Sequence, residues 1–141
     1  MKFILPLMLA LAMLSGCAIP SVKSTTPSPV IESLAAASYR QISMAEALVM
    51  MENEDDYIIL DVRTADEFAE KHIPGAINID NGHIGTEELP QLPDKEQLIM
   101  VYCRSGNRSK QASEKLVKLG YNNVVEFGGI NEWPGETVSG N

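Results

Sequence analysis

Residues 98–109 read Leu-Ile-Met-Val-Tyr-Cys-Arg-Ser-Gly-Asn-Arg-Ser. The apolar run from Leu98 to Tyr102 predicts a buried strand, and Ser109 to Leu119 predicts a helix. Cys103 therefore stands at the tip of a strand, before a short turn that contains Gly106. The N–H groups of such a turn converge on one point, and the helix N-terminus adds partial positive charge there. The pattern predicts a site for a thiolate, a persulfide or an oxyanion.

The composition indicates one globular domain with an acidic balance. The chain has 141 residues, of which 45% are hydrophobic and 21% are charged, and its formal net charge is −8. This length suits one domain rather than two. Because a nucleic-acid-binding protein needs a basic face, no nucleic-acid partner is expected.

The N-terminus has the pattern of a secretory signal peptide over residues 1–16. Lys2 precedes an apolar run, Phe3 to Leu14, that is short for a bilayer span, and Leu-Ser-Gly-Cys ends at Cys17. This ending resembles the lipobox of bacterial lipoproteins, which implies cleavage before Cys17 and lipidation of its sulfur. The alternatives are an ordinary signal peptide with an incidental cysteine, and an uncleaved anchor.

The lipobox resemblance sets the expected location of the protein. It implies export and a lipid anchor in the bilayer on the periplasmic side. Ala18 in place of aspartate implies sorting to the outer membrane in enteric-type bacteria. Residues 17–38, rich in proline and serine, are expected to be a flexible linker. With Cys17 carrying lipid, Cys103 is the one thiol left for chemistry, in a compartment that favours disulfides.

The folded domain is expected to begin near Tyr39 as alternating helices and strands. Capping boxes, Ser43 with Glu46 and Thr64 with Glu67, predict two helix starts, the second helix running through Glu70. Apolar runs predict further strands at residues 57–60, 76–79 and 124–127. Residues 81–94 are expected to be mostly loop, with a helical turn near Glu87. This alternation predicts an α/β fold with a parallel sheet and helices on both faces, and ligands at the carboxyl ends of the strands.

Four blocks of sequence, in order, resemble a single-domain rhodanese over residues 39–137, with 138–141 as a tail. The blocks are Asp61-Val62-Arg63 with Glu67-Phe68, His72-Ile73-Pro74-Gly75-Ala76, Cys103-Arg104-Ser105-Gly106-Asn107-Arg108-Ser109, and Gly128-Gly129 followed by Trp133. One departure is Lys71, where the family often has glycine. The resemblance implies a sulfurtransferase whose cysteine becomes a persulfide. The sulfur would come from a donor such as thiosulfate and pass to cyanide or a thiol, which a partner protein could supply, with no further cofactor.

The loop after Cys103 offers groups that suit this chemistry. Cys103 is the candidate catalytic nucleophile, and a helix N-terminus with nearby arginines can lower a thiol pKa from ~8.5 to about 3.5–7.5. Arg104 is expected to contact an anionic donor, and Arg108 to steady the anion and the loop, because guanidinium groups suit oxyanions. Gly106 would let the backbone curl around sulfur. Ser105 and Asn107 would offer mainly their N–H groups.

Asp61 and Arg63 are expected to support the site rather than to react. Asp61 ends a predicted strand beside Cys103, where it would accept hydrogen bonds from a neighbouring loop or pair with an arginine. A catalytic role for Asp61 is the alternative. Arg63 and Glu67 are expected to pair across the capping turn.

The remaining polar and aromatic candidates suit structural roles. His72 is expected to stabilise the turn at the Pro-Gly pair, and His83 to be a solvated surface residue. Trp133 is expected to fill the core. Two histidines and one free cysteine form no ligand pattern for a metal, so no metal site is expected.

Two other functions compete with sulfur transfer. In phosphatases and arsenate reductases of the same fold, five residues separate the cysteine from the arginine. Four residues lie between Cys103 and Arg108, and this tighter ring suits a single sulfur better than a phosphate. The second alternative is a non-catalytic rhodanese-like module for binding or regulation. Such modules usually lack the cysteine that this chain keeps.

Overall fold

The computed structural model describes residue 16, residues 38–86 and residues 88–141. Every helix and strand in these ranges belongs to one compact unit, Ala35–Asn141. Apart from Gly16 and Ser38, the predicted signal peptide, Cys17 and the linker lie outside the described residues, as does Glu87. Within the described ranges, no helix has both the length and the apolar character needed to cross a membrane.

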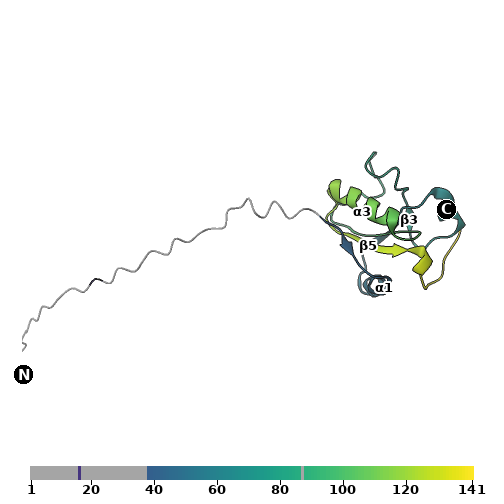
Figure 1. The fold of residues 1–141 in the computed structure, drawn as a ribbon, viewed down its shortest axis with the longest axis horizontal. Coiled ribbons are helices and arrows are strands. Elements are labelled where there is room, and N and C mark those ends of the chain that lie inside the picture. Colours follow the sequence, from purple (N-terminus) through teal and green to yellow (C-terminus); the bar gives the residue numbers. More distant parts are fainter. Residues whose placement is uncertain (1–15, 17–37, 87) are drawn as a thin grey trace, which may run out of the picture. The chain divides into compact units, whose positions relative to one another are not determined.

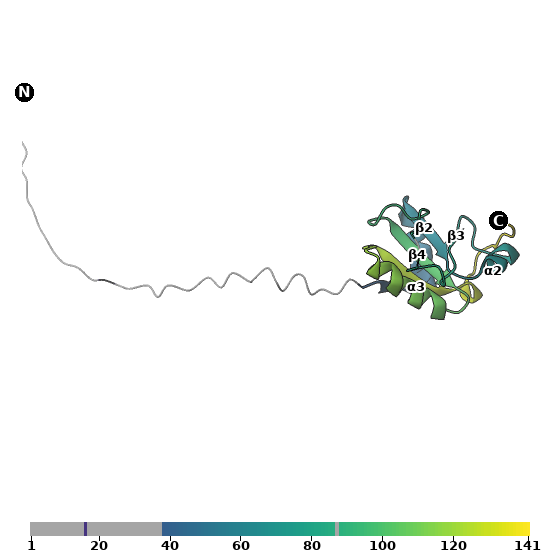
Figure 2. The same ribbon diagram turned by 90° about the horizontal axis from the view of Figure 1, so that it is seen from above.

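The centre of the domain is a parallel sheet of five strands in the order β1-β5-β4-β2-β3 (Figures 1 and 2). The strands are β1 (Arg40–Gln41), β2 (Tyr57–Asp61), β3 (Ile77–Asn78), β4 (Leu98–Cys103) and β5 (Val124–Gly129). The predicted strands are all present, and the α/β class is confirmed. Strand β1 was not predicted, because two residues are too few to show a period.

Helices cover both faces of the sheet. They are α1 (Met44–Asn53), α2 (Ala65–Glu70) and α3 (Asn107–Lys118), and a 3-10 turn, η2 (Ile130–Glu132), follows β5. Figure 1 shows α1 and α3 on opposite sides of the sheet, as predicted. Both capping boxes are formed, so α1 and α2 begin where the sequence predicts.

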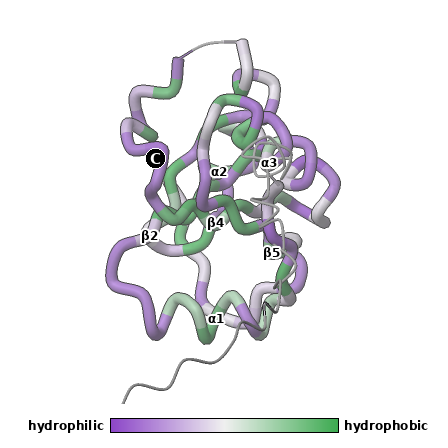
Figure 3. Tube along the Cα trace, turned by 90° about the vertical axis from the view of Figure 1, so that its left-hand side faces the viewer, coloured by the Kyte–Doolittle hydropathy of each residue, from purple (hydrophilic) through white to green (hydrophobic). Residues whose placement is uncertain are grey.

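Strand β4 is buried on both faces, which explains its continuous apolar sequence. Met100 and Tyr102 pack in the cluster that contains Ala47 of α1. Val101 and Cys103 point to the other face and pack in the cluster that contains Leu116 of α3. The hydrophobic colour of β4 in Figure 3 follows this central position. Cys103 is thus fixed by the core rather than by a mobile loop.

Helix α3 begins at Asn107, two residues before the predicted start at Ser109. Gly106 takes the N-cap position with a φ of 106°, in the left-handed region that glycine adopts readily. Gly106 has no side chain with which to cap this end of the helix. The helix therefore starts earlier than predicted, because the left-handed turn at Gly106 allows Asn107 and Arg108 to take helical positions. At the other end, Gly120 has a φ of 92° and ends the helix as predicted.

The last residues are joined to the domain, which corrects the prediction of a tail over 138–141. The N–H of His72 donates to Val138 O at 2.8 Å, and the N–H of Val138 donates to His72 O at 3.0 Å. The N–H of Gly140 donates to Ala69 O at 2.8 Å. Figure 2 shows the C-terminus beside α2. A four-residue segment gives no periodic signal, so only the fold reveals this pairing.

Candidate active site

The carboxyl ends of three neighbouring strands meet at one edge of the sheet. Asp61 ends β2, Cys103 ends β4 and Gly129 ends β5. Cys103 pairs with Gly129 after a register irregularity that begins at Val101. This edge is where parallel α/β sheets place their ligands.

The Cys103 sulfur lies inside the turn that the sequence predicted. The Gly106 N–H donates to Sγ at 3.0 Å, and the Ser109 hydroxyl oxygen lies 3.5 Å from Sγ. Burial raises the pKa of the Cys103 thiol, but the hydrogen bond with the Ser109 hydroxyl and those from the N–H groups of Ser109, Gly106 and Ser105 together lower it by more. The pKa of Cys103 is therefore below its usual value, which favours a reactive thiolate.

The Cys103 sulfur also takes the place of a capping side chain at the N-terminus of α3. Ser109 is the third residue of α3, and its backbone N–H is one of the groups that lower the pKa of Cys103. A capping side chain normally accepts from the N–H at this position. Negative charge on sulfur is therefore stabilised by the positive end of the helix as well as by the turn.

Two glycines end β5, and the second of them lets the Cys103 loop approach closely. A Cβ at Gly129 would overlap the carbonyl of Arg104 and lie 2.6 Å from the nitrogen of Ser105. The N–H of Asn131 donates to Arg104 O at 3.3 Å and holds the loop there. Gly128 has a φ of 96°, which other residues rarely adopt. Gly129 is thus required by the packing of the loop, and Gly128 by the conformation of its own backbone.

The two arginines of the loop have different surroundings. The Arg108 guanidinium forms a two-pronged ion pair with Glu67 of α2, with N–O distances of 2.6 Å and 2.9 Å. It therefore ties the loop to α2. The predicted pair between Glu67 and Arg63 is wrong, because Glu67 faces the loop. Arg104 is exposed, beside Cys103 in sequence.

Asp61 and Arg63 form a buried ion pair that supports the edge of the sheet. Arg63 Nε lies 3.0 Å from Asp61 Oδ1, and Arg63 Nη2 lies 2.6 Å from Oδ2. Their side chains are 0% and 4% exposed. Arg63 also donates to Lys71 O at 2.7 Å and so joins β2 to the turn after α2. The predicted pairing of Asp61 with an arginine is confirmed.

A model of the rhodanese-like domain family matches residues 43–136. The chain belongs to the rhodanese family. Among curated relatives, the thiosulfate sulfurtransferase PspE of Escherichia coli (strain K12) is 36% identical over 73 residues, which cover 52% of this chain and 70% of the relative. The thiosulfate sulfurtransferase GlpE of Coxiella burnetii is 33% identical over 96 residues, which cover 67% and 87% respectively.

Solved structures give the same assignment. The rhodanese with anions from E. coli is similar with a TM-score of 0.55 and 33% identity, over 60% of this chain and 99% of the solved chain. The fold predicted from the four sequence blocks is therefore that of a rhodanese.

The remaining candidates of this rhodanese domain have structural positions. His72 is buried, its Nδ1 lies 2.8 Å from Phe68 O, and its ring stacks on Phe68 with centroids 3.7 Å apart. His83 is exposed, as predicted. Trp133 is only half-buried, at the margin of the cluster on the α1 face, so it fills the core less than predicted. In residues 38–86 and 88–141, no group of three or more His, Cys, Asp or Glu residues could hold a metal ion.

Two residues near the sulfur were missed by the sequence analysis. Ser109 was placed in the loop block and at the helix start, but its hydroxyl was given no role; this hydroxyl donates to Glu126 Oε1 at 2.6 Å. Glu126 is 3% exposed. It is the one charged residue in the apolar run 124–127. A charge inside a predicted buried strand was the available signal.

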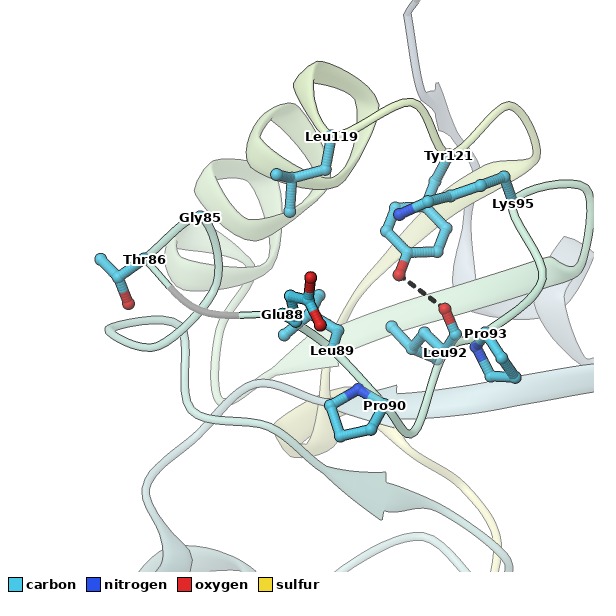
Figure 4. Close-up of a pocket in the computed structure, with 10 residues that line it drawn as sticks. All are labelled: Gly85, Thr86, Glu88, Leu89, Pro90, Leu92, Pro93, Lys95, Leu119 and Tyr121. Atoms are coloured by element: carbon cyan, nitrogen blue, oxygen red, sulfur yellow. Dashed lines mark hydrogen bonds between the residues drawn. The ribbon is translucent and has the colours of Figure 1, made fainter.

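A pocket of about 560 Å³ lies away from the Cys103 loop (Figure 4). It lies between the loop before β4 and the end of α3, and Glu88, Leu92 and Leu119 are among its lining residues. The Tyr121 hydroxyl donates to Leu92 O at 2.7 Å, and Lys95 Nζ lies 3.7 Å from the Tyr121 ring centroid. None of the predicted site residues lines this pocket. The pocket contains no cysteine, and Cys103 lies in a different part of the domain.

The ion pair between Glu67 and Arg108 predicts a loss of stability in acid. The hydrogen bond from Arg108 lowers the pKa of Glu67 to about 2, from 4.5 in an ordinary carboxyl. Because the folded pKa is lowered, this stabilisation is present above pH 4.5 and is lost as the pH falls toward 2. Since both side chains are partly exposed, we expect about 1 kcal/mol.

Glu67→Gln tests this prediction, because glutamine keeps the α2 cap but removes the charge. Urea unfolding at pH 6 and pH 3 is the measurement, with the wild type losing more stability between the two values than the variant. Equal losses in the two proteins would contradict the prediction.

Proposed function

We propose that this rhodanese is a sulfurtransferase that carries sulfane sulfur as a persulfide on Cys103. The donor is thiosulfate-like, and the acceptor is cyanide or a thiol, including the thiol of a partner protein. The observation that carries the proposal is the Gly106 N–H, 3.0 Å from the Cys103 sulfur in a loop with a four-residue gap to Arg108. The relatives named thiosulfate sulfurtransferases support it.

The reaction has two steps, and no cofactor is needed beyond the persulfide. The Cys103 thiolate attacks the outer sulfur of thiosulfate, a new S–S bond forms, and sulfite leaves with the electron pair of the broken S–S bond. The acceptor then attacks the outer sulfur of the persulfide, and the Cys103 thiolate leaves. The loop N–H groups stabilise the anionic sulfur in both steps.

Arg104 and Arg108 have different roles in this proposal. Arg104 is exposed beside Cys103, and we assign it the contact with the anionic donor. Arg108 holds the loop through Glu67 and adds positive charge near the sulfur. Ser105 and Asn107 are exposed, so their contribution is the backbone N–H rather than the side chain.

Intact mass spectrometry tests the proposal. Residues 18–141 contain the whole compact unit, and Cys103 is then the one thiol of the protein. Incubation with thiosulfate is expected to add one sulfur atom, and subsequent cyanide is expected to remove it as thiocyanate. No gain with thiosulfate or with a persulfide donor would contradict the proposal and favour a binding module. Cys103-dependent hydrolysis of a phosphoester would favour a phosphatase.

We also propose that the protein is exported and anchored by lipid on Cys17, on the periplasmic side. The apolar run before Leu-Ser-Gly-Cys supports this proposal. Cys17→Ser in the full chain, expressed in a Gram-negative bacterium, is expected to abolish labelling by a fatty-acid analogue. The wild type should be labelled and be recovered with the outer membrane. Equal labelling of both chains would contradict the proposal.

A further inference from the structure

Glu126 is a buried carboxylate beside the reactive sulfur. It is 3% exposed, and Oε1 accepts from the Ser109 hydroxyl at 2.6 Å and from the Gly128 N–H at 2.9 Å. Oε2 has a weaker contact with Gln41 Nε2, at 3.4 Å. Of the residues that the structure describes, no lysine or arginine pairs with Glu126, since both ion pairs involve other carboxylates. A buried carboxylate without a cationic partner is costly, and its position beside a nucleophile makes it a candidate for function.

Ser109 connects this carboxylate to the sulfur. Its hydroxyl oxygen lies 3.5 Å from Cys103 Sγ and 2.6 Å from Glu126 Oε1, and Ser109 is fully buried. The carbonyl oxygens of Gly106 and Gly128 are further acceptors at 2.9 Å and 3.4 Å, both longer than the contact with Glu126. A hydroxyl has one hydrogen to donate. While that hydrogen is directed to an ionised Glu126, Ser109 offers only a lone pair to sulfur, which favours the thiol. A thiolate needs the hydrogen directed to sulfur, which favours a protonated Glu126.

We propose that Cys103 and Glu126 share one proton through Ser109, and that Glu126 holds this proton while Cys103 is an anion. Glu126 is then a positioning residue, because it acts on the reacting sulfur through another side chain. This inference rests on the proposed sulfurtransferase function. Two negative charges so close together in a buried site repel each other, so the site holds a single negative charge.

The proton transfers balance with the sulfur transfer. The proton of the Cys103 thiol passes to the Ser109 oxygen, and the Ser109 hydrogen passes to Glu126 Oε1. The thiolate then takes the outer sulfur of thiosulfate, sulfite leaves with the electron pair, and Glu126 keeps the proton beside the persulfide anion. When the acceptor removes the sulfur, the proton returns by the same route.

Other titratable groups near Glu126 lie on the elements that pack against β5. Tyr39 precedes β1, and its pKa is raised by burial and by the charges of Glu114 on α3 and Glu126. On β4, Val101 pairs with Glu126, and the titratable group connected to Glu126 through Ser109 is Cys103. These groups add negative or neutral character, so they do not compensate the charge on Glu126.

The first test is the pH dependence of Cys103 alkylation by iodoacetamide in residues 18–141. Glutamine keeps the shape and the acceptor of Glu126 but cannot ionise. Glu126→Gln is therefore expected to lower the pH midpoint of alkylation by about one unit, which is a tenfold change in the thiolate ratio. An unchanged or higher midpoint would overturn the proposal. Alkylation needs no sulfur donor, so its result is independent of whether the protein transfers sulfur.

Ser109→Ala distinguishes two ways in which Glu126 could act on Cys103. One is the hydrogen-bonded connection through the Ser109 hydroxyl, and the other is direct charge repulsion between the carboxylate and the thiolate. In the Ser109→Ala background, Glu126→Gln is expected to move the midpoint by less than half as much, because the connecting hydroxyl is absent. An equal shift in both backgrounds would overturn the shared proton.

A second test uses only the wild-type protein, so it does not depend on whether a variant folds. Conversion of Cys103 to the anionic persulfide is expected to produce a protonated-carboxyl stretch in the infrared difference spectrum. Alkylation of Cys103 by iodoacetamide gives a neutral thioether. Glu126 is then expected to stay ionised, so the difference spectrum should lack the protonated-carboxyl band. Absence of the band in a persulfide-loaded sample verified by mass would overturn the proposal.

Discussion

Cys103→Ser is expected to lower the turnover of thiosulfate with cyanide at least about a thousandfold, because the nucleophile of both steps is lost. A serine hydroxyl fits the same buried position but remains protonated near neutral pH. It cannot hold sulfur in the ring of N–H groups around Sγ. The measurement is the rate of thiocyanate formation by residues 18–141.

Cys103→Ala and iodoacetamide-treated wild type are the matched controls for this loss. The alanine variant has no sulfur at this position, and iodoacetamide blocks the sulfur by alkylation. Both proteins should therefore form thiocyanate at the same low rate. Thermal unfolding should show that each protein is folded. Residual turnover near the wild-type rate in all three proteins would place the chemistry on another residue.

Asp61→Ala is expected to have the largest effect on stability, about 3–5 kcal/mol, because it leaves a buried charge unpaired. Arg63 would lose its carboxylate partner while its side chain stays 4% exposed. The Arg63 N–H would also lose its bond of 2.9 Å to Asp61 Oδ1. The free energy of unfolding in urea is the measurement.

Asp55→Ala is the matched control for that change. Asp55 is exposed in the bend before β2, and its removal is expected to change stability by no more than about 0.5 kcal/mol. Similar losses in the two variants would show that the buried pair is not the source of the effect.

The parts of the site that local sequence predicts are those set by neighbouring residues. The capping box joins Thr64 and Glu67, which are only three positions apart, and the position of Cys103 follows from the apolar run before it and the glycine after it. The buried pair of Asp61 and Arg63 also has a local signal. Side chains two residues apart in an extended chain lie on the same face.

The rest of the site depends on contacts between distant segments. Glu67 and Arg108 are 41 residues apart, and Ser109 and Glu126 are 17 residues apart. Strand order and register bring these residues together, and no local period records either. The sequence therefore indicated the wrong partner for Glu67 and overlooked the carboxylate beside the sulfur.

The division between main chain and side chain around Cys103 has a consequence for how such a protein can diversify. The sulfur is held largely by backbone N–H groups, whereas the side chains of Arg104, Ser105 and Asn107 are exposed. Replacing these side chains changes what an approaching molecule meets but leaves the backbone donors in place. Reactivity and partner choice are thus encoded separately, so new donors or acceptors can be acquired without rebuilding the reaction centre.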